Sequence, residues 1–354
     1  MSGGGDAITA DQLLASPALY LTDFSPKTGA AVLSRMSRQT YRDSVMLDQR
    51  IVTLGPAAAS PSIDSIHDLL TGQGTPAPIA WIQHIAFCGS TLLARALDVP
   101  DAGFALKEPF TLHRLAWIRR RIETGEAAGL GIDWERAHHV VCTLLARTWA
   151  PTERAVVKPT DSCNNIIEAC LTLNAESRSL LMYSTLDDFV ISTLKTAGRR
   201  EYLRNQLNRT QNDAAAYTHL ATIDTDGMKD AQLAAFAWLV QMNGYQDRID
   251  AGDDRIATLD GRRFLSEPAA ALPAIARFLG VTMTERQLAD MLASDVFTRH
   301  SKMAGRAFDK DAYASEQRAI RTRLASEIEA ARRFAEPYLE QRAIPERLDR
   351  DVLS

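Results

Sequence analysis

Three small polar residues stand where an apolar run gives way to a helical pattern. Gly89, Ser90 and Thr91 follow the apolar residues 79–82 and precede leucines at helical spacing. Gly89 allows a close backbone approach to a ligand, and the amides that open a helix attract negative charge. The hydroxyl groups of Ser90 and Thr91 would add hydrogen-bond donors. The segment therefore predicts a site for a phosphate or a similar anion.

The same loop departs from the motif of ATP- and GTP-hydrolysing proteins. When G-x-x-x-x-G-K-S/T is aligned on Gly89, His84 stands at the first glycine and Ser90 at the lysine. The motif therefore does not predict nucleotide hydrolysis. A Ser90 side chain that only caps a buried helix is the alternative interpretation of the segment.

Other reactive side chains follow two later apolar runs. Glu108 comes just after residues 104–106 and is a candidate general base, although it could instead cap the helix that opens at Pro109. Lys107 precedes it, and is either functional or a solvated lysine. His113 lies about one helical turn beyond Glu108 and could face a pocket or be structural. Lys158 directly follows the apolar residues 155–157, so it lies at a strand end, where functional residues are often found.

The elements that must position these residues alternate along the chain. Short apolar runs are typical of buried strands, and they are separated by helical patterns such as residues 166–173 and 231–242. The strand candidates are residues 79–82, 104–106, 155–157, 180–183 and 255–259. An extended run is also expected at residues 49–54. The alternation predicts an α/β fold whose parallel sheet is covered by helices on both faces.

Changes in composition along the chain suggest three parts. Residues 71–78 are rich in Gly and Pro and read as a linker. Residues 1–74 would form an N-terminal extension of small α/β or mixed structure with a disordered start, and residues 75–310 the main domain. The Ala-, Arg- and Glu-rich residues 311–354 would form a C-terminal helical extension.

Composition excludes several classes of protein. The formal net charge is -4, so no overall basic field would hold a nucleic acid or an anionic membrane. The four cysteines show no C-x-x-C spacing, which argues against structural zinc and a disulfide framework. We see neither a signal peptide nor an apolar run of about 18 residues, and we expect a soluble cytoplasmic protein.

The order of the motifs resembles the sulfotransferase family, in its bacterial and tyrosylprotein-type members. Residues 89–93 resemble the 5′-phosphosulfate loop R-S-G-S/T-T-L-L, and residues 106–109 the segment carrying the catalytic glutamate. Residues 157–160 look like the K-T/S-P segment, and residues 180–192 are similar to the 3′-phosphate motif h-h-R-D/N-P-x-D-x-x-x-S. The resemblance spans about residues 79–308, including a late strand and an F-L-G helix end.

The resemblance implies a P-loop NTPase-like sheet with helix-rich insertions and 3′-phosphoadenylyl sulfate (PAPS) as donor, with no metal required. It implies Glu108 as the catalytic base; Lys107 and His113 are further catalytic candidates because of their positions near Glu108. The implied donor-binding residues are Cys88, Gly89, Ser90, Thr91, Leu92, Lys158, Ser184, Ser192, Arg299 and Lys302.

Two positions depart from the family pattern. Phe87 stands where the family has the cation that contacts the transferring sulfuryl group, and Ser184 stands at the arginine that begins the 3′-phosphate motif. Ser192 falls at the expected spacing from it. An anion normally held by charge-assisted bonds would need other cations. The candidates are Lys107, Lys158, the cluster Lys195, Arg199, Arg200 and Arg204, and also Arg299, Lys302 and Arg306.

Three functions therefore stay open. The leading hypothesis is a sulfotransferase-like enzyme that acts on a hydroxyl or amine of a small-molecule, glycan or peptide acceptor. The second is an ATP- and Mg²⁺-dependent phosphotransferase on the same fold, in which Asp187 and Asp188 would hold the metal. The third is a non-catalytic sulfotransferase-like binding protein. The pattern leaves the oligomeric state open.

Overall fold

Five strands form one sheet in the order β4-β5-β3-β6-β7. They are β3 (Ile79–His84), β4 (Gly103–Lys107), β5 (Arg154–Lys158), β6 (Arg178–Tyr183) and β7 (Ile256–Asp260). The pairings of β3 with β5, β4 with β5 and β6 with β7 are parallel. Each strand overlaps one of the apolar runs predicted from sequence, because a strand covered on both faces buries nearly all of its side chains. The predicted α/β class with a parallel sheet is confirmed.

The computed structural model of the protein describes residues 8–298, 318–342, 344–345 and 347–354. The chain divides into two compact units that interleave along the sequence. Unit 1 comprises Met1–Trp81, Leu97–Arg178 and Gly280–Thr282, and unit 2 comprises Ile82–Ala96, Ser179–Leu279 and Met283–Ser354. The predicted domain borders at residues 74/75 and 310/311 stay predictions, and the second falls outside the described residues.

Unit 1 adds a small antiparallel sheet to strands β4 and β5. Its strands, β1 and β2, pair with a register shift between Leu21 and Asp23. The expected strand at residues 49–54 is wrong, since that run has no ladder partner and forms no strand. The other elements of unit 1 are β1 (Leu19–Phe24), β2 (Ala31–Arg35), α1 (Ala10–Leu14), α2 (Arg38–Asp43), α3 (Ile63–Leu70), α5 (Phe110–Glu123), α6 (Trp134–Leu145), η1 (Asp161–Ile166) and α7 (Ile167–Cys170).

An aromatic cluster fills part of the core of unit 1. The ring of Tyr41 meets those of Tyr20 and Phe104 edge-on, with centroids 5.4 Å and 4.9 Å away. The hydroxyl of Tyr41 donates to the carbonyl oxygen of Pro17 at 2.8 Å, so the buried phenol keeps a hydrogen-bond partner. These contacts join the N-terminal segment to strand β4.

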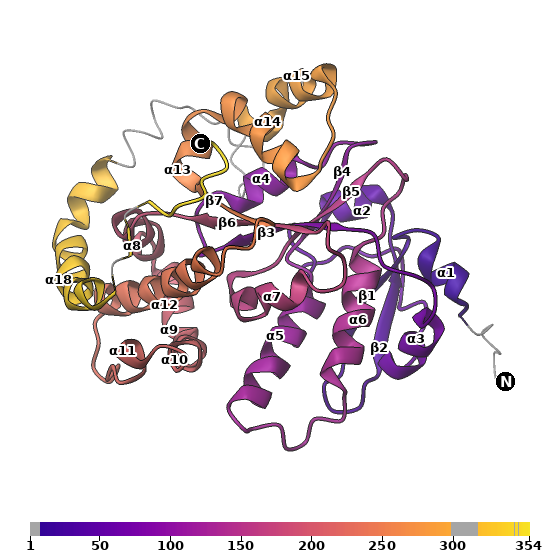
Figure 1. Ribbon diagram of the computed structural model, residues 1–354, viewed down its shortest axis with the longest axis horizontal. Helices are drawn as coiled ribbons and strands as arrows, with labels where there is room; N and C mark the ends of the chain where they lie inside the picture. The colour runs from indigo at the N-terminus through magenta and orange to yellow at the C-terminus, as the bar shows by residue number, and fades with distance from the viewer. Residues whose placement is uncertain (1–7, 299–317, 343, 346) are drawn as a thin grey trace. The chain divides into compact units, whose positions relative to one another are not determined.

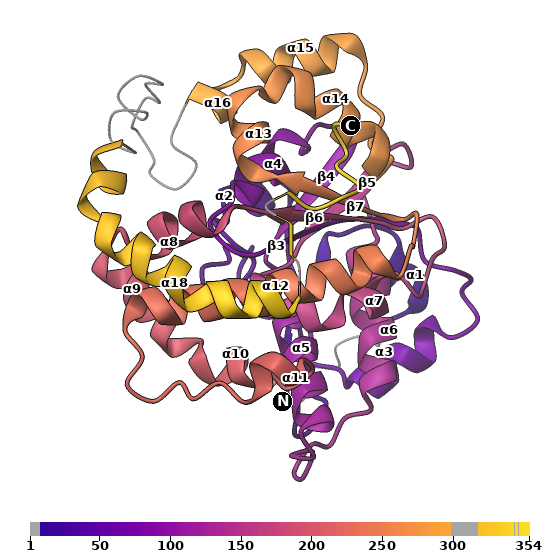
Figure 2. The ribbon, with the colours of Figure 1, turned by 60° about the vertical axis from the view of Figure 1, so that its left-hand side comes forward.

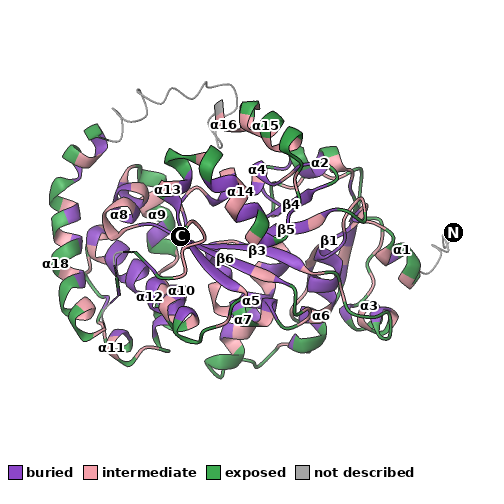
Figure 3. Cartoon of the chain, turned by 45° about the horizontal axis from the view of Figure 1, so that its top comes forward, coloured by how far each residue is buried: buried purple, intermediate pink, exposed green. Residues whose placement is uncertain are grey.

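Unit 2 carries most of the helices. Figures 1 and 2 show α13 and α14 on one face of β6 and β7 and the long helix α12 on the other. Figure 3 shows that strand β6 is buried. The helices of unit 2 are α4 (Ser90–Ala96), α8 (Leu186–Leu194), α9 (Ala197–Asn205), α10 (Leu207–Ala214), α11 (Thr218–Ala221), α12 (Asp230–Asp250), α13 (Gly261–Ser266), α14 (Pro268–Leu279), α15 (Glu285–Ala293), α16 (Asp295–Thr298) and α18 (Ala325–Gln341).

Candidate active site

The loop between β3 and α4 has an unusual backbone. Ala86 and Phe87 adopt left-handed φ values of 73° and 54°, and Gly89 has a φ of 90°. Left-handed conformations at residues other than glycine cost about 1–3 kcal/mol each and concentrate at functional sites. A backbone that turns in this way can also aim successive N–H groups at one anion, as in phosphate-binding loops. The geometry therefore suits the predicted anion site, and residues 87–91 are called the cradle below.

Neighbouring groups within unit 2 hold the loop in this form. The Nδ1 atom of His84 accepts a hydrogen bond from the amide of Ala86 at 2.9 Å. The amide of Ile85 donates to the carbonyl oxygen of Met182 in β6 at 3.2 Å. His84 therefore braces the loop through this hydrogen bond.

A glycine directly after β7, the first residue of α13, allows another close contact with the loop. A Cβ atom on Gly261 would lie 2.0 Å from the carbonyl oxygen of Cys88, where real Cβ atoms do not occur. Cys88 also places its Sγ atom 3.7 Å from the carbonyl oxygen of Met182. Gly261 was not among the site residues predicted from sequence. Its place two residues after the fifth apolar run was the available signal.

The first turn of α4 contains the predicted Ser90, Thr91 and Leu92. Ser90 and Thr91 are buried, and the amide of Leu92 donates to the carbonyl oxygen of Gly89 at 3.0 Å. That amide therefore already has a partner within the chain. The side chain of any residue other than glycine at position 89 would be strained at this φ and would contact Leu265 at 3.3 Å.

Phe87 occupies the loop position at which a cation was expected, and an arginine from α9 lies over its ring. The guanidinium carbon of Arg199 in α9 lies 4.2 Å from the centroid of the Phe87 ring, a cation–π geometry. Arg199 also donates from Nη1 to the carbonyl oxygen of Ser192 at 2.5 Å. Tyr202 meets the Phe87 ring edge-on at 6.0 Å. Three predicted elements, the loop, Ser192 and the α9 cation cluster, are thus brought together.

The remaining α9 cations point elsewhere. Arg200 and Arg204 both bind the carboxylate of Asp230, at 3.1 Å and 2.7 Å. Ser184 is buried, and its carbonyl oxygen accepts a hydrogen bond from Nε1 of Trp238 at 2.9 Å. Of these three arginines of α9, only Arg199 lies at the loop.

The two acids proposed for a metal are engaged by arginines. Asp187 binds Arg321 and Arg332, each at 2.8 Å, while Asp188 binds Arg262 and, at 3.3 Å, Arg321. Burial raises the pKa of the Asp187 carboxyl, but the hydrogen bonds from Arg332 and Arg321 outweigh it and hold the pKa below its usual range. Both carboxylates serve as anchors for arginines, including those of the C-terminal segment.

The candidate base lies in unit 1, directly after β4. Glu108 has a left-handed φ of 52°, and its amide donates to the carbonyl oxygen of Lys158 at 2.6 Å. The Lys158 ammonium, whose side chain is 1% exposed, binds the Glu108 carboxylate at 2.5 Å. Arg50 reaches the other carboxylate oxygen at 4.0 Å. The two predicted residues therefore form one ion pair at the ends of neighbouring strands.

Lys107 and His113 are placed differently from Glu108. The buried Lys107 ammonium donates to the carbonyl oxygens of Ser44 and Arg42, at 2.6 Å and 3.2 Å, and so fastens the segment after α2. The His113 ring stacks on Phe110 with centroids 5.5 Å apart. Neither contact tests the predicted catalytic roles, which stay predictions.

Other expectations concern residues that the structure covers only in part. Arg299, Lys302 and Arg306 lie outside the described residues. Among the residues that are described, no group of three or more His, Cys, Asp and Glu side chains is placed to hold a metal ion. Over the same residues, no helix combines the length and the apolar character needed to cross a membrane.

A structural comparison matches the chain with solved sulfotransferase structures. The domain from the curacin biosynthetic pathway has a TM-score of 0.43 and 14% identity, over 71% of this chain and 99% of that one. The domain from the Synechococcus PCC 7002 olefin synthase has a TM-score of 0.40 and 18% identity, over 72% and 94%. Sulfotransferase STF9 from Mycobacterium avium has a TM-score of 0.40 and 12% identity, over 79% and 82%.

Sequence comparison adds nothing to these structural matches. No protein-family model matches the chain, and a search of curated proteins finds no match. The structural matches to sulfotransferases have TM-scores of 0.40–0.43 at 12–18% identity.

Proposed function

We propose that this protein is a divergent sulfotransferase that moves a sulfuryl group from PAPS to a hydroxyl or an amine. The observation that carries the proposal is the loop after β3, where left-handed residues lie beside a cation. Arg199 stacks on Phe87 at 4.2 Å, and so supplies positive charge where the loop sequence itself has none. Backbone donors and a guanidinium at one loop suit a ligand whose reacting group is anionic.

Each part of the proposed site has a physical task. The amides of residues 87–91 would hold the 5′-phosphosulfate, because the Ala86 amide already donates to His84, and Arg199 would offset the charge of the donor. Ser192, whose carbonyl oxygen binds Arg199 at 2.5 Å, would contribute to the 3′-phosphate site. The donor supplies an activated sulfuryl group, whose bond to the 5′-phosphate oxygen breaks as the bond to the acceptor forms. Such transfer depends on positioning and charge compensation.

Glu108 would accept the acceptor's proton as the hydroxyl oxygen or amine nitrogen attacks sulfur. The ion pair with the buried Lys158 fixes the direction of the carboxylate, and the backbone bond from the Glu108 amide to Lys158 fixes its main chain. A base that must meet one proton benefits from such orientation.

The phosphotransferase alternative gains no support from the acids proposed for Mg²⁺. Asp187 and Asp188 bind three arginines, which would have to be displaced before a cation could enter. The position of the Walker lysine is Ser90. A sulfuryl donor fits these residues better, since it needs cations and amides near the loop and no carboxylates there.

The test compares three ligands on the same protein preparation. Adenosine 3′,5′-bisphosphate should raise the thermal unfolding temperature, because a ligand that binds only the folded state stabilises it. ATP with Mg²⁺ and GTP with Mg²⁺ should give no comparable gain. Stabilisation by ATP that requires Mg²⁺, with none from the bisphosphate, would refute the proposal.

A matched pair of glycine variants links binding to the loop. Gly89 and Gly74 have nearly equal φ values, 90° and 89°, but a Cβ on Gly74 meets nothing within 4 Å. Gly89→Ala should abolish the bisphosphate effect, while Gly74→Ala carries the same backbone strain and should keep it. Radiolabelled sulfate transfer to mixed phenol, glycan and peptide acceptors then separates an enzyme from a binding protein, which would bind the bisphosphate without turnover.

A further inference from the structure

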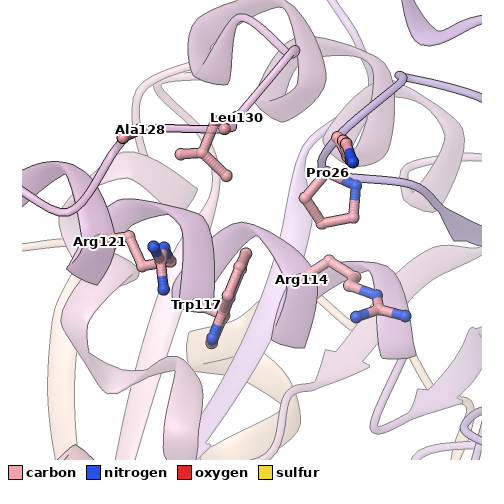
Figure 4. Close-up of a pocket in the computed structure, with 8 residues that line it drawn as sticks. Pro26, Arg114, Trp117, Arg121, Ala128 and Leu130 are labelled. Atoms are coloured by element: carbon pink, nitrogen blue, oxygen red, sulfur yellow. The ribbon is translucent and has the colours of Figure 1, made fainter.

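A hollow of about 360 Å³ opens on the surface of unit 1. Its floor is helix α5, and its walls are the turn after β1 and the loop that joins α5 to α6 (Figure 4). The lining includes Trp117, Arg114 and Arg121 from the helix and Pro26, Lys27 and Leu130 from the walls. The proposed function uses none of these residues.

The spacing of the helix residues places one aromatic ring between two cations. Arg114, Trp117 and Arg121 are three and four residues apart, so they lie along one face of α5. Trp117 is 40% exposed, whereas Trp81 and Trp134 are buried. The guanidinium carbon of Arg121 lies 5.1 Å from the Trp117 ring. Figure 4 shows the indole between the two arginine side chains, with Leu130 facing it.

Contacts within unit 1 fix the walls of the hollow. The amide of Gly131 donates to the carbonyl oxygen of Pro26 at 3.0 Å, which ties the two walls together. A Cβ atom on Gly131 would lie 2.1 Å from the carbonyl oxygen of Lys27, so only glycine permits this approach. Arg114 is held by two hydrogen bonds to Asp23 in β1, at 2.9 Å and 3.1 Å. A site that is preformed in this way costs less ordering when a ligand binds.

The charges around the hollow leave an excess of cations. Arg114 is paired with Asp23, and Arg121 lies 3.6 Å from the exposed carboxylate of Glu126. Among the residues described, Lys27 has no acidic partner. The apolar part of the lining includes Trp117 and Leu130 and suits a flat aromatic ring. Lys27 and Arg121 suit a negatively charged group.

We propose that this hollow binds a small aromatic anion. The ring of the ligand stacks against Trp117 and packs under Leu130, and its carboxylate, sulfate or phosphate group binds Arg121 and Lys27. An aryl acid and a nucleoside monophosphate share this chemistry. The site goes beyond the proposed function, because it needs neither the loop after β3 nor Glu108.

Isothermal titration of the full chain tests the site with four probes. Naphthoate is an aryl acid, adenosine monophosphate is a nucleotide, cyclohexanecarboxylate is an anion without an aromatic ring, and naphthylmethanol has the ring without the charge. We expect naphthoate or adenosine monophosphate to bind with a Kd on the order of 1 mM or below, given the size of such ligands. The other two probes should bind at least about fivefold more weakly, since each lacks one of the two interactions.

Variants of α5 identify where the probe binds. Trp117→Leu and Arg121→Gln should each weaken binding by about three- to tenfold, the loss expected for one stacking or cation contact. Arg121→Lys should keep more affinity than Arg121→Gln. The matched control is Arg119→Gln, which removes an arginine of the same helix that stacks on Trp134 at 5.2 Å and lies outside the lining.

The outcomes separate this site from the cradle. Gly89→Ala should leave naphthoate binding unchanged, so a failure of the proposed sulfotransferase function would not affect this result. The proposal is overturned if no aromatic anion binds, if cyclohexanecarboxylate binds as well as naphthoate, or if Arg119→Gln matches Arg121→Gln. A thermal melt of each variant confirms that it is folded.

Discussion

Replacing Arg199 with Gln should weaken binding of adenosine 3′,5′-bisphosphate by about tenfold. The guanidinium lies 4.2 Å from the Phe87 ring and 2.5 Å from the carbonyl oxygen of Ser192, so it is held over the loop before a ligand arrives. A hydrogen bond to a charged group contributes about 1.5–3 kcal/mol. Because Arg199 is only half-buried, the lower end of that range applies, and about 1.4 kcal/mol corresponds to a tenfold change.

Calorimetric titration at low and at moderate ionic strength measures this loss. The wild-type affinity should fall more steeply with added salt than that of Arg199→Gln, because the variant has one cation fewer to be screened. Arg204→Gln is the matched control, since Arg204 lies on the same helix and binds Asp230. Its affinity for the bisphosphate should stay within about twofold of the wild type.

A compensating variant separates charge from packing. Phe87→Arg places a cation in the loop itself, so the double variant Phe87→Arg/Arg199→Gln should regain most of the lost affinity. If Arg199 served only to pack against the ring, the double variant would bind more weakly than either single one. That result, or an unchanged affinity in Arg199→Gln, would refute the reasoning.

Three further predictions follow from named contacts. Glu108→Gln should abolish sulfuryl transfer while bisphosphate binding persists, and a Glu108→Gln variant that still turns over would exclude Glu108 as the base. Denaturant titration of this variant should show a free energy of unfolding lower by about 3 kcal/mol, because Lys158 loses its partner. Adding Lys158→Met should recover most of that stability. Gly261→Ala should weaken bisphosphate binding, since its Cβ would lie 2.0 Å from the Cys88 carbonyl oxygen and displace the loop; titration curves identical to the wild type would contradict this contact. Burial lowers the pKa of His138 from 6.5 to about 4, so as the pH falls this histidine takes up a proton in the unfolded chain before it does so in the folded protein. The free energy of unfolding should therefore be highest above pH 6.5 and should fall as the pH drops toward 4. The contribution of this residue is about 3 kcal/mol, and denaturant titrations of His138→Gln should be less dependent on pH over that window; equal slopes would refute the assignment.

The strands of the parallel sheet could be predicted from local sequence. Each of β3 to β7 is a short apolar run, because side chains on both faces of such a strand are buried. The smaller sheet could not be found in this way. Strands β1 and β2 depend on pairing with each other and on packing of β1 against α5 and α6. The run at residues 49–54 has a strand-like composition but no pairing partner.

The sequence by itself determined where the chemistry would concentrate. Small residues at 89–91 after a buried strand, and Glu108 and Lys158 after two others, follow from local patterns of residue type and spacing. The left-handed backbone at Phe87 and Glu108 was not visible in that pattern, because a conformation of this kind is imposed by the surrounding structure.

Only the tertiary structure decided which charges meet which partners. Among several cations named from sequence, Arg199 reaches the Phe87 ring, Arg200 and Arg204 bind Asp230, and the Lys107 ammonium is used by backbone carbonyls. Asp187 and Asp188 were candidates for a metal until α8 was seen to bind arginines from α13 and the C-terminal segment. These pairings join residues far apart in the chain, and their energies depend on the distance and burial that packing sets. A local pattern contains neither quantity, so the source of the cation at the loop had to come from the fold.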